Sequence, residues 1–345
     1  MKNLGCLNKI AYFFNIVLVL LTLLGFLLPS LAPKLFPFLA VLTLILPSLL
    51  ILNLFFVVYW LLQFKRQVFL SVIICLIGFT FFSKFYKFQG KNEEQIEDDF
   101  TVLSYNVRLF NLFKWLPKNN VPENIQRFIE EQNPDIICFQ EYSHSAEYEL
   151  NDYKFRHIIM HGNKIKTGQA IFSKYRMIDQ GEILLPNSNN NVVYADIVKA
   201  DDTIRVYSIH LQSIDISSDL NEQIDEDKSK RIFKRISTAF KEQQLQSELI
   251  QEHMKDFKGH KIVCGDMNNT AFSYVYKNVK GEMNDAFVEA GKGFGQTYNY
   301  PYYPARIDYI LADKVFEIKE FQTFRDFDNS DHFPIMARMN MKNEE

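Results

Sequence analysis

Charged side chains are almost absent from the first quarter of this 345-residue chain. Between Ile10 and Phe82 the only charged residues are Lys34, Lys65 and Arg66. A water-soluble fold of that length needs a largely polar surface, so the shortage argues against an independently soluble domain here. The second part is different, because charges occur throughout and apolar runs are short, as in an ordinary globular domain.

Cysteine is scarce, and positive charge is not in surplus. The four cysteines form no Cys-x-x-Cys or Cys/His cluster that would indicate zinc or redox chemistry. Cys138 and Cys264 lie inside apolar runs, so we expect small buried core residues. From Asp98 onward the chain has 30 Lys/Arg and 38 Asp/Glu. Proteins that grip duplex DNA by its phosphates usually carry a basic stripe, so the acidic balance disfavours that substrate, although a metal ion can supply local positive charge.

Three apolar runs dominate the N-terminal part, and a membrane span needs roughly 20 such residues. We therefore predict that residues 1–90 form a membrane region with about three transmembrane helices, or two spans plus an interfacial segment because the third run is short. A cleavable signal peptide is disfavoured, since two further apolar runs follow the first. The runs are Ile10–Leu28, Leu35–Phe64 (in which Pro47 is expected to cause a kink) and Val68–Phe82.

The orientation of these helices is only weakly encoded, because lysines and arginines divide almost evenly between the two sides. Lys2 and Lys9 before the first run favour an N-terminus inside. Three spans then place the soluble part outside the cytoplasm, at the plasma (inner) membrane. Lys84, Lys87 and Lys91 follow the last run and are expected to anchor at lipid headgroups. Residues 91–99 are expected to form a short solvated linker.

The soluble part, residues 100–342, alternates short β-rich runs with helical patterns. Many short strands with helices between them fit a four-layer α/β sandwich, two packed β-sheets flanked by helices. Helices are predicted at Val121–Gln132 and Glu222–Phe257. Strands are predicted at Phe100–Val107, Ile136–Gln140, Gln169–Ser173, Val192–Val198, Ile204–Gln212, Lys261–Cys264, Ile307–Leu311, Phe316–Phe324 and Pro334–Met339.

Polar residues stand where several apolar strands end. Strand ends at one edge of a layered structure converge on a shared site, and carboxylate and amide oxygens suit Mg²⁺ or Mn²⁺ better than zinc. Each residue alone has a plain structural alternative, such as a turn-capping Asn, a core His or an Asx turn. Their joint placement favours a site. The candidates are Asn106, Glu141, His210, Asp266, Asn268, Asp308, Asp331 and His332.

The motifs SYNVR, FQE, GQAIFSK, SIHLQS, GDMNN, RIDYIL and SDHFPI, read in order, resemble the motif set of the endonuclease/exonuclease/phosphatase (DNase I-like) family. The resemblance covers about Phe100 to Asn340. It implies a four-layer sandwich with active-site loops at one edge, and an enzyme that hydrolyses phosphoric esters with a divalent metal. The implied metal is Mg²⁺, with Mn²⁺ possible. Its implied ligands are Asn106, Glu141 and Asp331.

The resemblance also implies catalytic roles. His332 would be the general base, with its tautomer fixed by Asp308. Asp266 would orient or activate the water, and the choice between Asp266 and His332 as base stays open. Asn268 and His210 would donate hydrogen bonds to the transition-state oxyanions, and His210 has the alternative role of protonating the leaving oxygen.

The substrate is less well defined by the sequence. Tyr153, Tyr175 and Tyr194 are candidates for the tyrosine of abasic-site nucleases, whereas the basic cluster of inositol phosphatases is missing from SIHLQS and GDMNN. The acidic Asp215–Asp227 insertion would repel a polyanion. We predict a membrane-anchored phosphodiesterase acting on a phospholipid headgroup or nucleic acid; the alternatives are a DNA or RNA nuclease, a lipid or inositol phosphatase and a sphingomyelinase-like phospholipase. A catalytically dead scaffold is disfavoured, because every polar motif residue is present.

Overall fold

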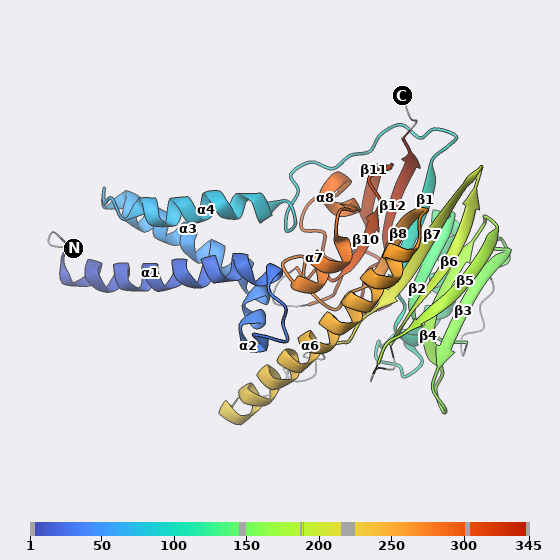
Figure 1. Ribbon diagram of the computed structural model, residues 1–345, viewed down its shortest axis with the longest axis horizontal. Helices are drawn as coiled ribbons and strands as arrows, with labels where there is room; N and C mark the ends of the chain where they lie inside the picture. Colours follow the sequence, from blue (N-terminus) through green and yellow to red (C-terminus); the bar gives the residue numbers. More distant parts are fainter. Residues whose placement is uncertain are drawn as a thin grey trace.

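The computed structural model describes residues 4–144, 150–186, 188, 190–214, 225–300 and 304–342. An apolar bundle of helices extends to one side, and a β-sandwich with its own helices forms the rest (Figure 1). The bundle contains α1 (Cys6–Leu27), η1 (Leu28–Ser30), α2 (Pro37–Ala40), η2 (Val41–Leu44), α3 (Leu46–Leu62) and α4 (Val68–Phe82).

The sandwich consists of two six-stranded sheets. The first has the order β11-β12-β1-β2-β4-β3 and the second β5-β6-β7-β8-β10-β9. The strands are β1 (Phe100–Asn106), β2 (Ile136–Tyr142), β3 (Phe155–His161), β4 (Thr167–Ser173), β5 (Met177–Leu184), β6 (Asn191–Lys199), β7 (Asp202–His210), β8 (His260–Asp266), β9 (Asn284–Asp285), β10 (Asp308–Ala312), β11 (Phe316–Thr323) and β12 (Ile335–Met341).

Helices complete the layers on both outer faces. α5 (Val121–Gln132) has Pro122 in its first turn and ends at Asn133, which adopts the left-handed conformation typical of a helix end. It joins the parallel strands β1 and β2, and α6 (Glu226–Asp256) joins the parallel strands β7 and β8. α7 (Tyr274–Lys280) packs beside α6, and α8 (Ala286–Ala290) packs on β11. The predicted four-layer sandwich is confirmed.

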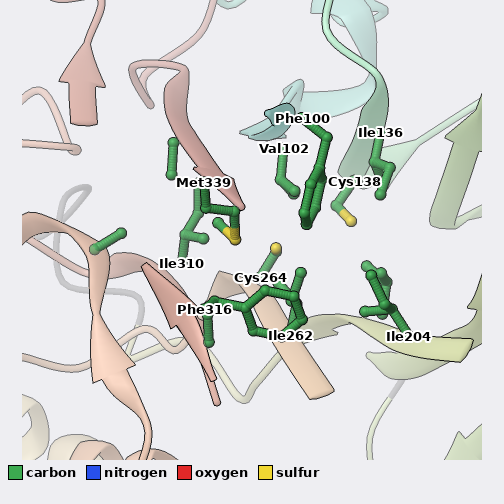
Figure 2. Packing of buried hydrophobic residues seen from close by; sticks show 14 of the residues in the cluster. Phe100, Val102, Ile136, Cys138, Ile204, Ile262, Cys264, Ile310, Phe316 and Met339 are labelled. Carbon is green, nitrogen blue, oxygen red and sulfur yellow. The ribbon is translucent and has the colours of Figure 1, made fainter. Parts of the chain in front are cut away.

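The main core lies between the two sheets. Phe100, Val102 and Cys138 of the first sheet face Ile262 and Cys264 of the second (Figure 2). Both cysteines are fully buried and free, as their apolar runs predicted. Separate clusters fill the space between each sheet and its outer helices. Successive side chains along each strand therefore point alternately to the inter-sheet core and to an outer helix, as the two-residue period of β-structure requires.

The apolar bundle encloses a cluster of hydrogen-bonded polar side chains, next to buried Leu46 and Ile74, and its outer surface is apolar. Asn15 donates to Ser71 Oγ over 2.6 Å, Trp60 donates to Asn15 Oδ1 over 2.9 Å, and Asn53 donates to Thr22 Oγ1 over 2.9 Å. These polar side chains are fully buried, whereas the outward surface is made of exposed Leu, Ile and Phe. This arrangement is the reverse of a water-soluble bundle, and it matches helix packing in lipid, where polar groups bond across helices.

Among the residues that the structure describes, one helix is long and apolar enough to cross a membrane, α1 with its extension to Ser30. Only 28% of its most apolar stretch is buried. A second candidate exists if α2–η2 and α3 count together, but they meet at a 64° bend. The bend falls at Ile45, two residues before Pro47, where a kink was expected and which occupies the first turn of α3. α4 has 15 residues, shorter than a span. The number of spans stays a prediction.

Residues 84–99, which we call the strap, run from α4 to β1 along the sandwich. Lys87 exchanges two backbone hydrogen bonds with Gly293, and the Lys91 N–H donates to Ala290. Buried Asp99 accepts from Arg338 Nη1 over 2.7 Å. Most strap residues are exposed, but the segment is docked rather than free. Lys84, expected at lipid headgroups, instead places its Nζ over the Tyr276 ring and near the Ala271 carbonyl.

Candidate active site at the strand ends

The polar candidates continue the rows of side chains that form the inter-sheet core. On β1 the inward row runs Phe100, Val102, Ser104 and Asn106, and on β8 it runs Ile262, Cys264 and Asp266. His210 on β7 and Asp308 on β10 are in phase with core residues of their strands in the same way. The core is apolar in its middle and becomes polar at one edge. Alternation along the strands therefore aims these side chains at one another.

Glu141 joins this row only because β2 is irregular. The side chains of β2 that point to the inter-sheet core are Ile136, Cys138 and Gln140, so a regular strand would direct Glu141 to the opposite face. The register with β4 shifts between Phe139 and Tyr142, and Glu141 takes a positive φ of 50°. Such a β-bulge re-aims a side chain and is frequent beside active sites. The result is that Asn106 Nδ2 lies 3.2 Å from Glu141 Oε1.

Gly265 brings β7 and β8 together at the site. It has a φ of +131°, and a Cβ there would lie 2.1 Å from the Ile209 carbonyl oxygen. Only glycine fits both the conformation and the space. The parallel register then pairs His210 with Asp266 directly, and His210 Nε2 lies 3.8 Å from Asp266 Oδ2.

A buried chain of three residues forms the centre of the site. The two oxygens of Asp308 lie 3.0 and 3.1 Å from His332 Nδ1, and His332 Nε2 on the far side of the ring lies 3.6 Å from Asp266 Oδ2. Asp266 Oδ2 also accepts from Asn106 Nδ2 over 3.2 Å. The predicted pairing of His332 with Asp308 is therefore present, and Asp266 faces the ring nitrogen that Asp308 leaves available.

Burial and charge set the electrostatics of this chain. Burial raises the pKa of Asp266 to about 8, because a desolvated carboxylate is costly. Burial alone would lower the pKa of His332, but the nearby carboxylates of Asp308 and Asp266 outweigh it and raise that pKa to about 10. Burial lowers the pKa of His210, which Glu141 offsets only in part. Acids outnumber the cations here, an imbalance that a bound divalent cation would correct.

Asn268 and Asp331 lie at the site but are already engaged. The Asn268 backbone N–H donates to Asp266 Oδ1 over 2.7 Å, and its side-chain amide donates to the Leu211 carbonyl over 3.0 Å. Asp331 Oδ2 forms an ion pair of 2.9 Å with Arg108 Nη1. The backbone N–H of Arg108 in turn donates to Asn106 Oδ1 over 3.1 Å. Asp331 is thus joined to Asn106 through Arg108.

Several residues that support the site were not predicted from the sequence. Thr297 Oγ1 accepts from the backbone N–H groups of Ile307 and Asp308, each over 3.0 Å, and the Tyr298 ring packs edge-on against His332 with centroids 4.9 Å apart. No sequence signal marks Thr297 or Tyr298, since both lie in a loop. Ser330 could have been found, because it belongs to the SDHFPI motif, and its Oγ donates to the Asn106 carbonyl over 2.8 Å.

A buried polar layer separates the site from the apolar core. Gln140 Nε2 donates to Ser208 Oγ over 3.0 Å, and Ser208 Oγ donates to Gln169 Oε1 over 2.7 Å. These residues come from three strands and are fully buried. Polar positions inside the apolar runs IICFQ, GQAIF and YSIH were the available signal. The layer holds strand ends of both sheets in register beneath the site.

The tyrosine candidates lie elsewhere. The Tyr153 hydroxyl donates to the Pro134 carbonyl, Tyr175 packs against the inter-sheet core, and Tyr194 packs against Arg205 and His253. None of the three has a hydrogen bond to a site residue within the part of the chain that the structure describes. Most of the acidic Asp215–Asp227 insertion, residues 215–224, lies outside the described residues.

The donor set fits a hard divalent cation. Among the described residues, ligand atoms of Asp266, Asp308 and His332 lie within 4.8 Å of one another, and Glu141 and Asn106 border this group. Carboxylate oxygens predominate in this group, and Mg²⁺ prefers oxygen ligands. Of the three predicted ligands, Glu141 and Asn106 are adjacent, whereas Asp331 is paired with Arg108.

Comparison with known proteins places this geometry in context. Residues 103–332 match the Endonuclease/Exonuclease/phosphatase family, and residues 8–85 match a domain of unknown function, DUF8431. No curated protein matches the chain. The endonuclease/exonuclease/phosphatase family protein from Leptotrichia buccalis is 21% identical with a TM-score of 0.51, over 70% of this chain and 99% of that one.

Two further solved structures have the same fold. The endonuclease/exonuclease/phosphatase from Bacteroides vulgatus is 19% identical with a TM-score of 0.52, over 71% of this chain and 99% of its own. D. rerio TDP2 complexed with a single-strand DNA product is 14% identical with a TM-score of 0.52, over 71% of this chain and all of that one. The family match spans more than half of the sequence and contains every predicted site residue. The chain therefore belongs to the endonuclease/exonuclease/phosphatase family, whose members are metal-dependent phosphoester hydrolases.

Proposed function

We propose that the chain is a membrane-anchored, Mg²⁺-dependent phosphodiesterase that directs a water molecule at phosphorus from the strand-end site. One observation carries the proposal. The buried Asp308–His332–Asp266 chain meets Glu141, Asn106 and His210 at a single point, although these residues come from separate strands and loops.

Glu141 and Asn106, with Asp331 beside them, would hold the metal. Mg²⁺, when bound, supplies Lewis-acid stabilisation of a phosphate oxygen. The bulge at Glu141 and the ion pair between Arg108 and Asp331 position these donors. Mn²⁺ prefers the same oxygen ligands and would serve in its place.

Proton transfer falls to the pair of Asp266 and His332. A bound divalent cation would favour the deprotonated forms of these two residues, offsetting the rise in their pKa values. The attacking water then forms a bond to phosphorus and gives its proton to the unprotonated member of this pair, and the 3.6 Å contact lets the pair share the charge. Asp308 fixes the ring through Nδ1, which leaves Nε2 directed at Asp266. Both residues stay candidates for the base, as the sequence suggested.

His210 and Asn268 complete the site. His210 Nε2, 3.7 Å from Glu141 Oε1, is placed to donate to an equatorial oxygen or to protonate the oxygen that leaves when the ester bond breaks. The Asn268 amide carries two N–H donors, and its bond to Leu211 uses one of them. The other is available for the oxyanion.

The apolar bundle supports the membrane anchor. α1 has the length and composition of a span and is largely unburied, and the bundle packs its polar residues inward. α1 runs towards the sandwich, α3 runs away from it and α4 returns (Figure 1). Asn8 accordingly bonds Gln63 at the far end. If each helix crosses the bilayer, an inside N-terminus places the sandwich outside the cytoplasm.

Labelling tests the orientation directly. Glu282, 92% exposed on the sandwich, is changed to Cys in a background that carries Cys6→Ser and Cys75→Ser. The other two cysteines, Cys138 and Cys264, are buried. A membrane-impermeant maleimide should label intact cells. Labelling only after lysis would reverse the orientation.

Hydrolysis by the purified full chain in detergent tests the enzyme proposal. The panel contains bis-p-nitrophenyl phosphate, a single-stranded oligonucleotide, sphingomyelin, glycerophosphocholine and inositol phosphates, each with Mg²⁺ and with EDTA. Glu141→Ala, Asp266→Ala and His332→Ala should each lose at least about 100-fold in kcat/KM, in line with single catalytic groups.

Matched controls separate chemistry from general damage. Glu282→Ala removes an exposed glutamate, and His161→Ala removes a half-exposed histidine paired with Glu182; both should keep wild-type rates. Equal rates for wild type and all three site variants on every substrate would refute the proposal.

A further inference from the structure

An exposed aromatic pair stands beside the active site, in the segment that follows Asn106. Phe113 and Trp115 are 49% and 42% exposed, and their rings meet edge-on with centroids 5.0 Å apart. Leu112 before them is 40% exposed. The catalytic roles above do not use this pair. Large aromatic side chains left in solvent next to a reaction centre are unusual, because burying them is normally favourable.

The backbone holds the pair rigidly. Arg108, Leu109, Phe110 and Asn111 all have positive φ, from 43° to 60°, a conformation that is costly for residues other than glycine. The η3 turn (Arg108–Asn111) is fixed by Asn111. Its side chain accepts from the Leu116 N–H over 2.9 Å and donates to the Leu116 carbonyl over 3.0 Å. The strained turn therefore presents Phe113 and Trp115 in a defined place.

Arg108 connects the aromatic pair to the site. Its guanidinium carbon lies 4.7 Å from the Trp115 ring centre, a cation–π contact, and its Nη1 lies 2.9 Å from Asp331 Oδ2. Its backbone N–H donates to Asn106, which touches both Glu141 and Asp266. The Arg108 side chain thus lies between Trp115 and the residues that would surround the reacting phosphorus.

The position of this segment argues against a lipid occupant. The apolar bundle contacts α6 and α7, which cover the second sheet: Lys34 N–H donates to Gln244 Oε1 and Lys277 Nζ donates to Ser30 Oγ. The aromatic segment follows β1 of the first sheet, and Lys118 near its end pairs with Asp328. The anchoring helices and the aromatic pair therefore belong to opposite layers of the sandwich.

We propose that Phe113 and Trp115 form a stacking platform for the nucleobase next to the scissile phosphate, so that the substrate is single-stranded nucleic acid. The inference rests on the proposed phosphodiesterase function and names its substrate class. Aromatic faces bind bases of any identity. The exposed Lys114 supplies positive charge where the backbone phosphate would pass. A duplex keeps its bases stacked and paired, so the platform selects single strands.

Binding without turnover tests the platform. The full chain in detergent, with EDTA present, is titrated into fluorescein-labelled oligo(dT), and anisotropy is measured at low salt. Trp115→Ala should weaken binding about 5- to 150-fold, the range for one stacked base, and Phe113→Ala should have a smaller effect. Trp115→Phe should restore most of the affinity, because it keeps an aromatic face. Phe88→Ala, which removes a 75% exposed aromatic of the strap, should leave binding unchanged.

Hydrolysis then separates this inference from the function beneath it. With Mg²⁺, Trp115→Ala should raise KM for the oligonucleotide and leave hydrolysis of glycerophosphocholine, which has no base, unchanged. If wild type binds oligo(dT) through Trp115 but cleaves no diester, the proposed function fails and the platform stands. Equal oligo(dT) binding by wild type and Trp115→Ala overturns the platform alone.

A lipid-inserting role has its own signature. The chain contains two tryptophans, Trp60 in the bundle and Trp115. Wild type and Trp115→Ala are both placed in nanodiscs with brominated phosphatidylcholine, which quenches tryptophan fluorescence. The fluorescence that wild type loses should be no greater than the loss in Trp115→Ala, whose only emission comes from Trp60. Additional quenching of the Trp115 emission would place this ring in the bilayer and overturn the proposal.

Discussion

Replacing Arg306 with Met should destabilise the protein more than any exposed charge removal, because Arg306 joins the bundle to the sandwich. Its guanidinium is buried, with Nη1 3.1 and 2.8 Å from the two oxygens of Asp285. Its Nη2 donates over 3.0 Å to the carbonyl of Lys84, the first residue of the strap, two residues after α4 ends. Phe287 and Tyr309 lie against its guanidinium, 4.6 and 4.7 Å away.

The magnitude follows from what Met leaves behind. Removing one partner of a buried ion pair costs about 3–5 kcal/mol, since the remaining charge is uncompensated. Asp285 keeps the Tyr276 hydroxyl at 2.7 Å and the Phe287 N–H at 3.0 Å, which favours the lower end. For a domain of this size the melting temperature should fall by about 6–20 °C.

Thermal unfolding of the full chain in detergent measures the effect. Lys314→Met is the matched control, because its partner Glu282 is 92% exposed and pairs between exposed side chains contribute little to stability. A melting temperature for Arg306→Met within about 2 °C of Lys314→Met would show that the junction does not stabilise the fold. Activity should fall as well, because Arg306 lies two residues before Asp308.

Three further outcomes are expected. Gly265→Ala should lower the melting temperature by at least 5 °C and abolish activity, since its Cβ would meet the Ile209 carbonyl at 2.1 Å. Gly5→Ala, with open space around it, should match wild type. Equal melting temperatures for the two variants would contradict the close approach of β7 and β8. EDTA should abolish hydrolysis and lower the melting temperature, with Mg²⁺ restoring both; full activity in EDTA would exclude the metal. Burial lowers the pKa of His157 in the folded chain, so the unfolded chain binds this proton first. Stability should therefore fall as pH drops below about 6.5, with a slope of at most about 1.4 kcal/mol per pH unit from this group. His157→Gln, which keeps a donor for the Gly181 carbonyl, should remove that component in acid denaturation curves.

The sequence predicted those parts of the fold in which local pattern and tertiary structure agree. The apolar runs that became β1, β2 and β8 are strongly periodic or continuous, and α5 has the predicted bounds Val121–Gln132. β3, β5 and the two-residue β9 were missed, as were the short helices α7 and α8. β5 is an edge strand whose residues from Ile178 to Gln180 are exposed, so it lacks the alternation that burial of one face produces.

The candidate site was predictable as a set of residues but not as a geometry. Strand-end position suggested that Asn106 and Asp266 would meet, and they do. The bulge that turns Glu141 inward and the ion pair that holds Asp331 depend on register and on long-range contacts, which no local pattern encodes. The same limit applies to Thr297, which supports Asp308 from a loop.

The docked strap has a consequence for what the enzyme reaches. A flexible tether lets a catalytic domain sample many heights and tilts above a bilayer. Here the pairing of Lys87 with Gly293, the salt bridge between Asp99 and Arg338, and the Arg306 bond to Lys84 fix the sandwich to its helices. If the apolar bundle crosses a membrane as proposed, the reaction centre is therefore held at one distance and one angle from the bilayer.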